Sequence, residues 1–546
     1  MNRKLVFFIC LPLLASASAL ATEEPQCDQS SKVSFETNDI FDLSEPDTII
    51  LHQWANILHY NTRPGTLVNE SAFFLKKCEI TEPDLAELER HLRNLSYLRD
   101  ALVTQDDDGR ILVKTWDNWS LTPTIDFGRE GGVNEYALGI KDHNLFGLGI
   151  NADIEYFKNE QRSGYKLKTS FPLFLGQNIN ADIRLSNNDD GSSHSIFLTK
   201  DFVSFDTPYA YRFGFDNFNQ IDTIRQNGTT ITQFNHDQSL TTIHWKKLYS
   251  DTEYSTLRFG LGYSRESHLF YDQNLTAIPS NNGPLLPKNR EFNYPFASME
   301  YLQKDFRELV NFNLINQIED FNLGWHGNLI LGADIGASSN DYNRNNDSLF
   351  SPSILYKASL SKGIEIAKSG FLFFNAYAEG ERYSEKITNN RTFFRFSTEY
   401  FHTINDYWAG YIKNENTFSN KQFFDRPVAI VGESGVRGYP LQYQHGANTS
   451  QLSLEARYYP RINIYKFFEL GGAAFIDIGK AYGDSILSST SPNTNPNTLA
   501  SMGIGARLYS THSSESQVIH FDIIKPLSTD TNVSNLEFRV TTKQSF

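Results

Sequence analysis

The sequence predicts an all-β transmembrane barrel that follows a small α+β domain. Three observations support this fold class. The chain begins with an export signal, apolar and polar residues alternate over many segments after residue 121, and no later stretch holds the roughly 18 apolar residues that a membrane-spanning helix needs. A barrel strand shows only every second side chain to lipid, so a hydrophobic fraction of 40% suits such a barrel.

The composition argues against a nucleic-acid-binding protein and against a disordered one. The 546 residues include 49 Lys and Arg against 64 Asp and Glu, a formal net charge of −15. A nucleic-acid groove needs a basic surface to release counterions from phosphates, so we expect no nucleic-acid partner. Aromatic residues make up 14% of the chain, which argues against a disordered protein.

Residues 1–21 have the layout of a secretory signal peptide. Arg3 and Lys4 precede an apolar block over 5–14, and Ala19 and Ala21 form a small-x-small cleavage site. The alternative, a short membrane anchor, fits less well because the block is short and serines interrupt it. Export and a membrane barrel together predict the outer membrane of a Gram-negative bacterium as the location.

Two cysteines, Cys27 and Cys78, remain after the signal peptide is removed. An oxidising compartment allows them to form a disulfide, with two free thiols as the alternative. No histidine or further cysteine is grouped beside them, so we expect no metal site there.

Residues 22–117 predict one small α+β domain. Thr81 and Asp84 flank Pro83 in a typical helix start, in which the threonine caps the helix and an acid follows three residues on. A leucine stripe at helical spacing then predicts a helix with one face in a small core: Leu85, Leu88, Leu92, Leu95 and Leu98. The other expected elements are a strand within 32–42, helices over 49–60 and 68–75, and a hairpin of 101–105 with 110–115.

Residues 118–546 predict the barrel. Alternation of apolar and polar residues recurs over segments that include 149–157, 177–185, 254–263, 451–458 and 518–523. A soluble antiparallel sheet also alternates. The many segments of roughly 9–12 residues, their aromatic ends and the export signal favour a membrane barrel. Lipid forbids open strand edges, so the sheet must close on itself.

The connections predict which end of the barrel is external. Links such as 142–147 and 205–208 are short, whereas 267–290, 419–450 and 481–499 are long and polar. Outer-membrane barrels have short periplasmic turns and long external loops. About 21 segments qualify as strands, an odd number that cannot hold if both chain ends are periplasmic. At least one segment between 290 and 419 is therefore expected to belong to a loop.

The last segment has the pattern of a closing strand. Leu536, Phe538 and Val540 lie on one face, and the terminal Phe546 falls on the same face. A terminal aromatic on an apolar stripe suits a strand that assembly machinery recognises by edge pairing.

The 419–450 loop carries a motif, and the strands after it carry matching residues. The loop contains Gly435, Val436, Arg437, Gly438 and Tyr439; Glu455 follows on one strand; and Phe475, Asp477 and Gly479 form an F-x-D-x-G motif on the next. Apolar residues flank both acids, so both carboxylates are expected to face the lumen. The alternative is a chance tetrapeptide on a solvated loop.

This set resembles the BamA/TamA and two-partner-secretion superfamily of outer-membrane barrels, also called bacterial surface antigens. In that family a long external loop folds back into the barrel and carries V-R-G-Y/F at its tip. The resemblance implies that Arg437 meets Glu455 and Asp477 through bidentate bonds that lysine could not form. It also implies 16 antiparallel strands, with 18–20 as the alternative.

The resemblance extends to the N-terminal domain. Its strand–helices–hairpin order is similar to that of a POTRA domain, the periplasmic module of the family, and residues 88–98, 119–121 and 142–147 look like members with a single POTRA. About 95 residues accommodate one such domain, whereas the essential assembly factor carries five and secretion partners usually two.

The resemblance implies an outer-membrane protein assembly or insertion factor. Client strands would be received by β-augmentation, at POTRA sheet edges and at a weakly paired seam between 121–128 and 535–546. The alternative is a two-partner-secretion-type transporter that exports an unfolded polypeptide through the lumen. Expected partners are unfolded outer-membrane or secreted clients, the lipid bilayer, and periplasmic chaperones or accessory subunits.

Two further function classes fit the residues less well. A hydrolase would need a nucleophile, but Ser434 lies in no G-x-S-x-G elbow, and His520 and Asp522 share a strand face without a serine motif. A passive pore would conduct ions without depending on Arg437. There is no P-loop, and we expect no enzyme activity, catalytic residue, metal or cofactor.

Overall fold

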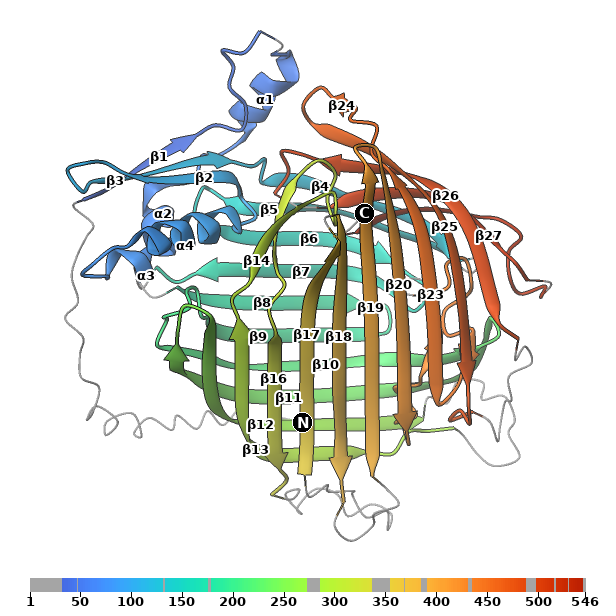
Figure 1. Ribbon diagram of the computed structural model, residues 1–546. Helices are drawn as coiled ribbons and strands as arrows, with labels where there is room; N and C mark the ends of the chain where they lie inside the picture. The colour runs from blue at the N-terminus through green and yellow to red at the C-terminus, as the bar shows by residue number, and fades with distance from the viewer. Residues whose placement is uncertain are drawn as a thin grey trace, which may run out of the picture.

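The computed structural model shows an N-terminal α+β unit at one end of a large barrel (Figure 1). We call this end of the barrel the near end and the opposite one the far end. The structure describes residues 32–46, 48–130, 133–174, 178–272, 285–335, 354–367, 369–383, 390–430, 435–487, 497–514, 517–528 and 530–543. Among these residues, no helix is both long and apolar enough to cross a membrane.

The N-terminal unit is a three-stranded sheet covered by helices. Its strands are β1 (Val33–Asn38), β2 (Leu98–Gln105) and β3 (Ile111–Asp117), in the order β1-β3-β2, with β1 parallel and β2 antiparallel to β3. The helices are α1 (Ile50–Leu58), α2 (Pro64–Glu70), α3 (Ala72–Leu75) and α4 (Glu82–Arg93). The element order is the predicted one, although the helix expected over 68–75 is divided into α2 and α3.

The leucine stripe of α4 fills the core of this unit. Thr81 and Asp84 form a capping box that starts the helix. Leu88 and Leu92 are fully buried and pack with Phe74 and Val113. Burying each such side chain stabilises the fold by about 1.5–3 kcal/mol relative to leaving it exposed.

The barrel is one closed antiparallel sheet. Its first ten strands are β4 (Leu121–Glu130), β5 (Val133–Leu145), β6 (Ile150–Lys158), β7 (Ser163–Pro172), β8 (Ile179–Asn188), β9 (Gly191–Lys200), β10 (Tyr209–Gln226), β11 (Thr229–Asp251), β12 (Ser255–Asp272) and β13 (Arg290–Gln303). The other ten are β16 (His326–Ala333), β17 (Ile354–Ala367), β18 (Gly370–Arg382), β19 (Arg391–Asn405), β20 (Trp408–Asn420), β23 (Asn448–Tyr458), β25 (Phe468–Tyr482), β26 (Leu499–Ser510), β27 (Val518–Pro526) and β28 (Glu537–Lys543).

The predicted all-β barrel is confirmed; the expected 16 strands are wrong, and the count falls within the alternative of 18–20. The described residues form a barrel of 20 strands, and the two-residue β24 (Asn463–Ile464) only extends the pairing along β25. The number 16 came from the family resemblance rather than from the alternating segments. The surplus segments between 290 and 419 are β14 (Phe306–Val310) and β15 (Ile318–Asn322), which form a separate two-stranded sheet.

The two faces of the barrel wall differ as a membrane barrel requires. Large apolar side chains such as Ile154, Leu261 and Ile504 are each more than 60% exposed, whereas the charged Arg507 and Asp522 on neighbouring strands are buried inside. Lipid would cover the first set, and the lumen holds the second.

The first and last strands meet at a weakly paired seam. β28 pairs with β4 through only Arg539↔Gly128 and Val540↔Phe127, among the described residues. By contrast, β4 pairs with β5 along its whole length, from Leu121↔Asp142 to Glu130↔Val133. The ladder at this seam, as far as the structure describes it, is thus much shorter than the neighbouring one.

A turn of the barrel holds the N-terminal unit in place. The backbone N–H of Arg63 and the hydroxyl of Thr66 both donate to the carbonyl of Gly147, at 2.9 and 2.8 Å. Gly147 has φ +73°, and a Cβ there would lie 2.3 Å from the carbonyl oxygen of Asn61. Only glycine suits both the turn and the close approach.

We expect Gly147→Ala to loosen the N-terminal unit from the barrel. The left-handed backbone costs about 1–2 kcal/mol with a side chain, before the clash is added. Limited proteolysis should release the unit faster than in the unaltered protein. Gly65→Ala is the matched control, because no atom lies within 4 Å of a Cβ at that position; equal release by the two variants would contradict this role of Gly147.

The same junction should weaken in acid through His512. The Arg99 guanidinium donates to His512 Nε2 at 2.9 Å, and the Phe41 ring stacks on the imidazole at 4.4 Å. Burial, together with the Arg99 charge, lowers the pKa of His512 from 6.5 to about 4. The unfolded state then binds the proton more readily, so the stabilisation is present above pH 6.5 and is lost as the pH falls toward 4. Protease release should speed up over this range, and His512→Gln should flatten the dependence.

Candidate functional site

The connection between β20 and β23 folds back from the far end into the lumen. Its two short strands, β21 (Ala429–Ile430) and β22 (Gln444–His445), pair with each other. Val436, Tyr439 and Tyr443 are buried and pack against Leu499 of the wall. Residues 431–434, which include Ser434, considered above for a hydrolase, lie outside the described residues.

Arg437 of this connection lies between two carboxylates of the inner wall. Its Nε and Nη2 atoms donate to the two oxygens of Asp477 at 2.6 and 2.7 Å, and Nη1 lies 3.1 Å from Glu455 Oε1. The guanidinium carbon is 3.4 Å from the centre of the Phe475 ring, a cation–π contact. Arg437 is 6% exposed and Asp477 is 1% exposed, so water screens these charges little.

Further charged groups complete this network. Ser453 donates to Asp477 Oδ1 at 2.8 Å, and Arg457 Nε lies 3.1 Å from Glu455 Oε2. On the next strands, Arg507 and Asp522 form a fully buried pair at 2.6 Å. Asp522, considered above for a hydrolase, is thus an ion-pair partner. Arg457 and Arg507 were not predicted as members of the network, although both fall on the luminal face of their strands.

The glycines of the two motifs make room for close packing. A Cβ at Gly479 would lie 2.7 Å from Val436 Cγ2, so the last residue of F-x-D-x-G admits the valine of the loop motif. Gly438 has φ +87°, and a Cβ there would lie 2.8 Å from Pro526 Cγ. Tyr439 then donates its hydroxyl to the carbonyl of Ala500 at 3.1 Å.

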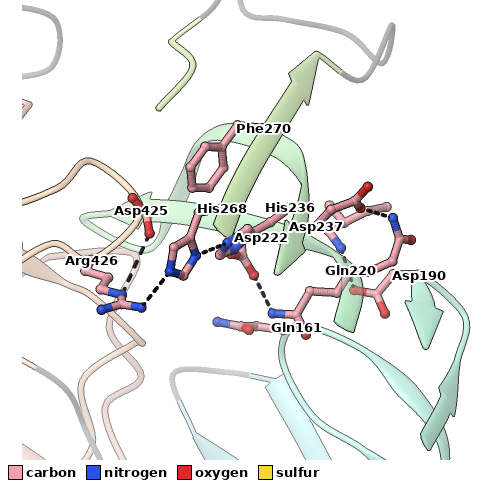
Figure 2. Close-up of polar contacts among 12 residues, drawn as sticks. Gln161, Asp190, Gln220, Asp222, His236, Asp237, His268, Phe270, Asp425 and Arg426 are labelled. Carbon is pink, nitrogen blue, oxygen red and sulfur yellow. Dashed lines mark hydrogen bonds and ion pairs between the residues drawn. The ribbon is translucent and has the colours of Figure 1, made fainter. Parts of the chain in front are cut away.

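A second anchor holds the same connection to a different sector of the wall. Arg290 of β13 donates through both Nη atoms to Asp425, at 2.8 and 2.7 Å. The neighbouring Arg426 lies 3.5 Å from Glu266 and from His268 of β12. Figure 2 shows Arg426 beside His268 at the start of a chain of polar contacts that continues into the wall.

That chain consists of side chains on adjacent strands. His268 Nδ1 lies 2.9 Å from His236 Nε2, and His236 Nδ1 lies 2.6 Å from Asp222 Oδ2 (Figure 2). Both imidazoles are buried. No motif pointed to this anchor, because it depends on which wall residues the folded-back connection reaches.

The remaining predicted residues lie away from this network. Cys78 is disulfide-bonded, and Cys27 lies outside the described residues. Phe538 is 57% exposed on the outer face of β28, Val540 lies on the same strand, and Phe546 is also outside the described residues. In the described part of the chain, no group of three or more His, Cys, Asp or Glu side chains is arranged to hold a metal ion.

Comparison with known proteins gives structural likenesses only. No protein-family model matches the chain, and no curated protein matches it in sequence. The chain is similar to BamA from Haemophilus ducreyi lacking POTRA domains 1–3, at 11% identity over 94% of this chain and 84% of that one, with a TM-score of 0.37. It is also similar to CdiB from Escherichia coli, at 13% identity over 95% of this chain and 79% of that one, with a TM-score of 0.45. For CdiB from Acinetobacter baumannii the identity is 10% over 88% of this chain and 72% of that one, with a TM-score of 0.43.

Removing the central guanidinium should destabilise the barrel. We expect Arg437→Ala to cost about 3–5 kcal/mol, because it leaves Asp477 and Glu455 buried without their common partner. The temperature at which the folded form disappears on a semi-native gel should fall. Arg395→Ala is the control, since Arg395 pairs with Glu415 at 3.7 Å on a half-exposed part of the wall. An unchanged transition for Arg437→Ala would contradict the ion-pair role.

The packing of the two motifs should show as an energetic coupling. We expect Gly479→Ala alone to cost about 1–3 kcal/mol, because the new methyl group overlaps Val436. Combining it with Val436→Ala should recover part of that loss, since the smaller side chain removes the overlap. The double-mutant cycle is measured on the same gel transition, and additive effects would contradict the contact.

Proposed function

We propose that the protein belongs to the BamA/TamA-like superfamily and assembles or inserts outer-membrane proteins. The observation that carries the proposal is the seam, at which the described residues of β28 and β4 share two residue pairs in an otherwise fully paired barrel. The Arg437–Asp477 contact supports the superfamily assignment, because it joins the residues of both motifs.

The seam supplies the chemistry that strand insertion needs. A strand entering lipid must satisfy every backbone N–H and C=O group, since each unsatisfied group costs several kcal/mol. A ladder of so few pairs can open, and the backbone groups of β4 and β28 then offer a client strand its first hydrogen bonds within the membrane. The client then moves into the bilayer as part of a sheet.

The N-terminal unit, as a POTRA domain in the periplasm, would receive the client before the seam does. β1 and β2 are the two edges of its sheet, and backbone pairing at an edge requires little of the client sequence. This arrangement puts the near end in the periplasm and the long far-end connections outside the cell, after removal of a signal peptide over 1–21. Unfolded clients delivered by periplasmic chaperones or accessory subunits are the partners.

The second candidate is a two-partner-secretion-type transporter. The 20-strand barrel favours it, because barrel diameter grows with strand number and this lumen is lined by charged side chains. The two candidates use different routes, since one client leaves through the seam and the other through the lumen.

A disulfide across the seam separates the two candidates. Arg539 and Gly128 are paired residues, so Gly128→Cys with Arg539→Cys should lock β28 to β4. We expect the oxidised form to lose insertion of barrel clients into liposomes and the reduced form to regain it. Ala152→Cys with Thr169→Cys, across the fully paired β6 and β7, is the matched control.

The disulfide experiment tests the seam mechanism, and depletion of the protein from cells tests which class of client it handles. Insertion by the locked barrel would overturn the proposed seam mechanism. If cells depleted of this protein lose one secreted protein but keep an unchanged set of outer-membrane barrels, the transporter is favoured. Loss of several barrels would favour assembly, and an unchanged membrane and secretome would exclude both.

A further inference from the structure

The near-end connection between β13 and β16 is a second element that enters the barrel. β14 and β15 pair from Phe306↔Asn322 to Val310↔Ile318 and form a hairpin, which we call the near-end hairpin (304–325). Figure 1 shows β14 rising at the near end, beside the barrel strands that follow it. The other near-end connections that join consecutive barrel strands are shorter, so this hairpin calls for a separate explanation.

The tip of the hairpin is buried against the inner wall. Leu309, Phe312 and Ile315 are at most 6% exposed. The Phe312 ring meets Phe373 of β18 at 5.0 Å and Phe401 of β19 at 5.3 Å, both edge-to-face. The same cluster includes luminal residues farther round the wall: Tyr459, Ala473, Tyr509 and Val518. The wall is therefore apolar where the hairpin lies, although much of the lumen is charged.

Three hydrogen bonds fix the tip to the wall. Arg457 Nη1 donates to the carbonyl of Phe312 at 2.8 Å, and the Tyr459 hydroxyl donates to the carbonyl of Asn311 at 2.8 Å. Asn316 Nδ2 donates to Glu469 Oε2 at 2.8 Å. The hairpin thus crosses from β13 and β16 to β23 and β25, and covers the part of the near mouth between them.

One carboxylate links this hairpin to the far-end connection. Glu455 Oε1 lies 3.1 Å from Arg437 Nη1, and Glu455 Oε2 lies 3.1 Å from Arg457 Nε. Arg437 belongs to the connection that enters from the far end, whereas Arg457 holds the hairpin that enters from the near end. All three side chains are less than 10% exposed, so each charge depends on the others for its solvation.

We propose that the near-end hairpin is a built-in plug of the lumen, and that Glu455 couples its seating to that of the far-end connection. Loss of the Glu455 charge leaves both arginines without their common carboxylate, so both closures weaken together. Both ends of the lumen are then obstructed at rest. This holds whether clients leave by the seam or by the lumen, so it is independent of the proposed function.

Removal of the hairpin tests the plug. The backbone N–H of Gln303 donates to the carbonyl of Trp325 at 2.7 Å, and Leu302 pairs with His326, so a short turn can replace residues 306–322 without moving β13 or β16. In planar bilayers, we expect the deletion variant to conduct ions continuously and the unaltered protein to be mostly closed. Phe373→Cys should react with maleimide in the deletion variant and be protected with the hairpin present.

Point variants test the coupling. Arg457→Met removes a charged hydrogen-bond donor to the hairpin. The fraction of time for which the barrel conducts ions should therefore rise about 10–100-fold. Glu455→Gln should raise it as well, and the double variant should show less than the product of the two effects. Glu455→Gln should also increase labelling of Phe373→Cys and lower the gel transition, because it removes the carboxylate that both closures share. Arg395→Met, which alters a luminal ion pair away from both closures, should leave conductance and labelling unchanged.

Two results would overturn the proposal. A deletion variant that is folded on a semi-native gel, yet conducts and labels like the unaltered protein, would show that the hairpin is no plug. Independent effects of Arg457→Met and Glu455→Gln, or unchanged labelling with Glu455→Gln, would show that Glu455 does not couple the two closures. Neither result bears on client insertion, which the seam disulfide measures separately.

Discussion

The buried charge balance inside the barrel fixes the positions of the segments that enter it. A guanidinium shielded from water needs carboxylates within bonding distance, because its desolvation costs several kcal/mol. Arg437 finds Asp477 and Glu455, Arg457 shares Glu455, and Arg507 pairs with Asp522. These three arginines face three carboxylates, and the observed position of the far-end connection brings Arg437 into this set.

Much of the wall could be predicted from the sequence, because the information is local. Alternation with a period of two sets which side chains face lipid, and it placed Glu455 and Asp477 on the luminal face before any strand was paired. The structure brings Arg437 to both. The number of strands was wrong because the family value of 16 was preferred to the count of alternating segments. β14 and β15 pair with each other and not with the wall, and only such tertiary pairing decides whether a strand joins the barrel.

Contacts across the lumen could not be predicted in the same way. Arg290 meets Asp425, which is 135 residues away, and Arg457 meets Phe312, which is 145 residues away. Such pairs depend on the curvature of the closed sheet and on the depth to which each connection descends. The motif around Arg437 was recognisable because a family resemblance supplied its partners, whereas nothing comparable pointed to the chain from Arg426 through His268 to Asp222.

The far-end connection also has a mechanical consequence. Fastened by Asp425 to β13 and by Arg437 to β23 and β25, it acts as a cross-brace that keeps this sector of the cylinder from flattening. The ladder between β28 and β4, by contrast, holds two residue pairs among the described residues. Thermal deformation of a wide cylinder concentrates where it is least stiff, so shape fluctuations of this barrel should be directed toward the sparsely paired join between its first and last strands.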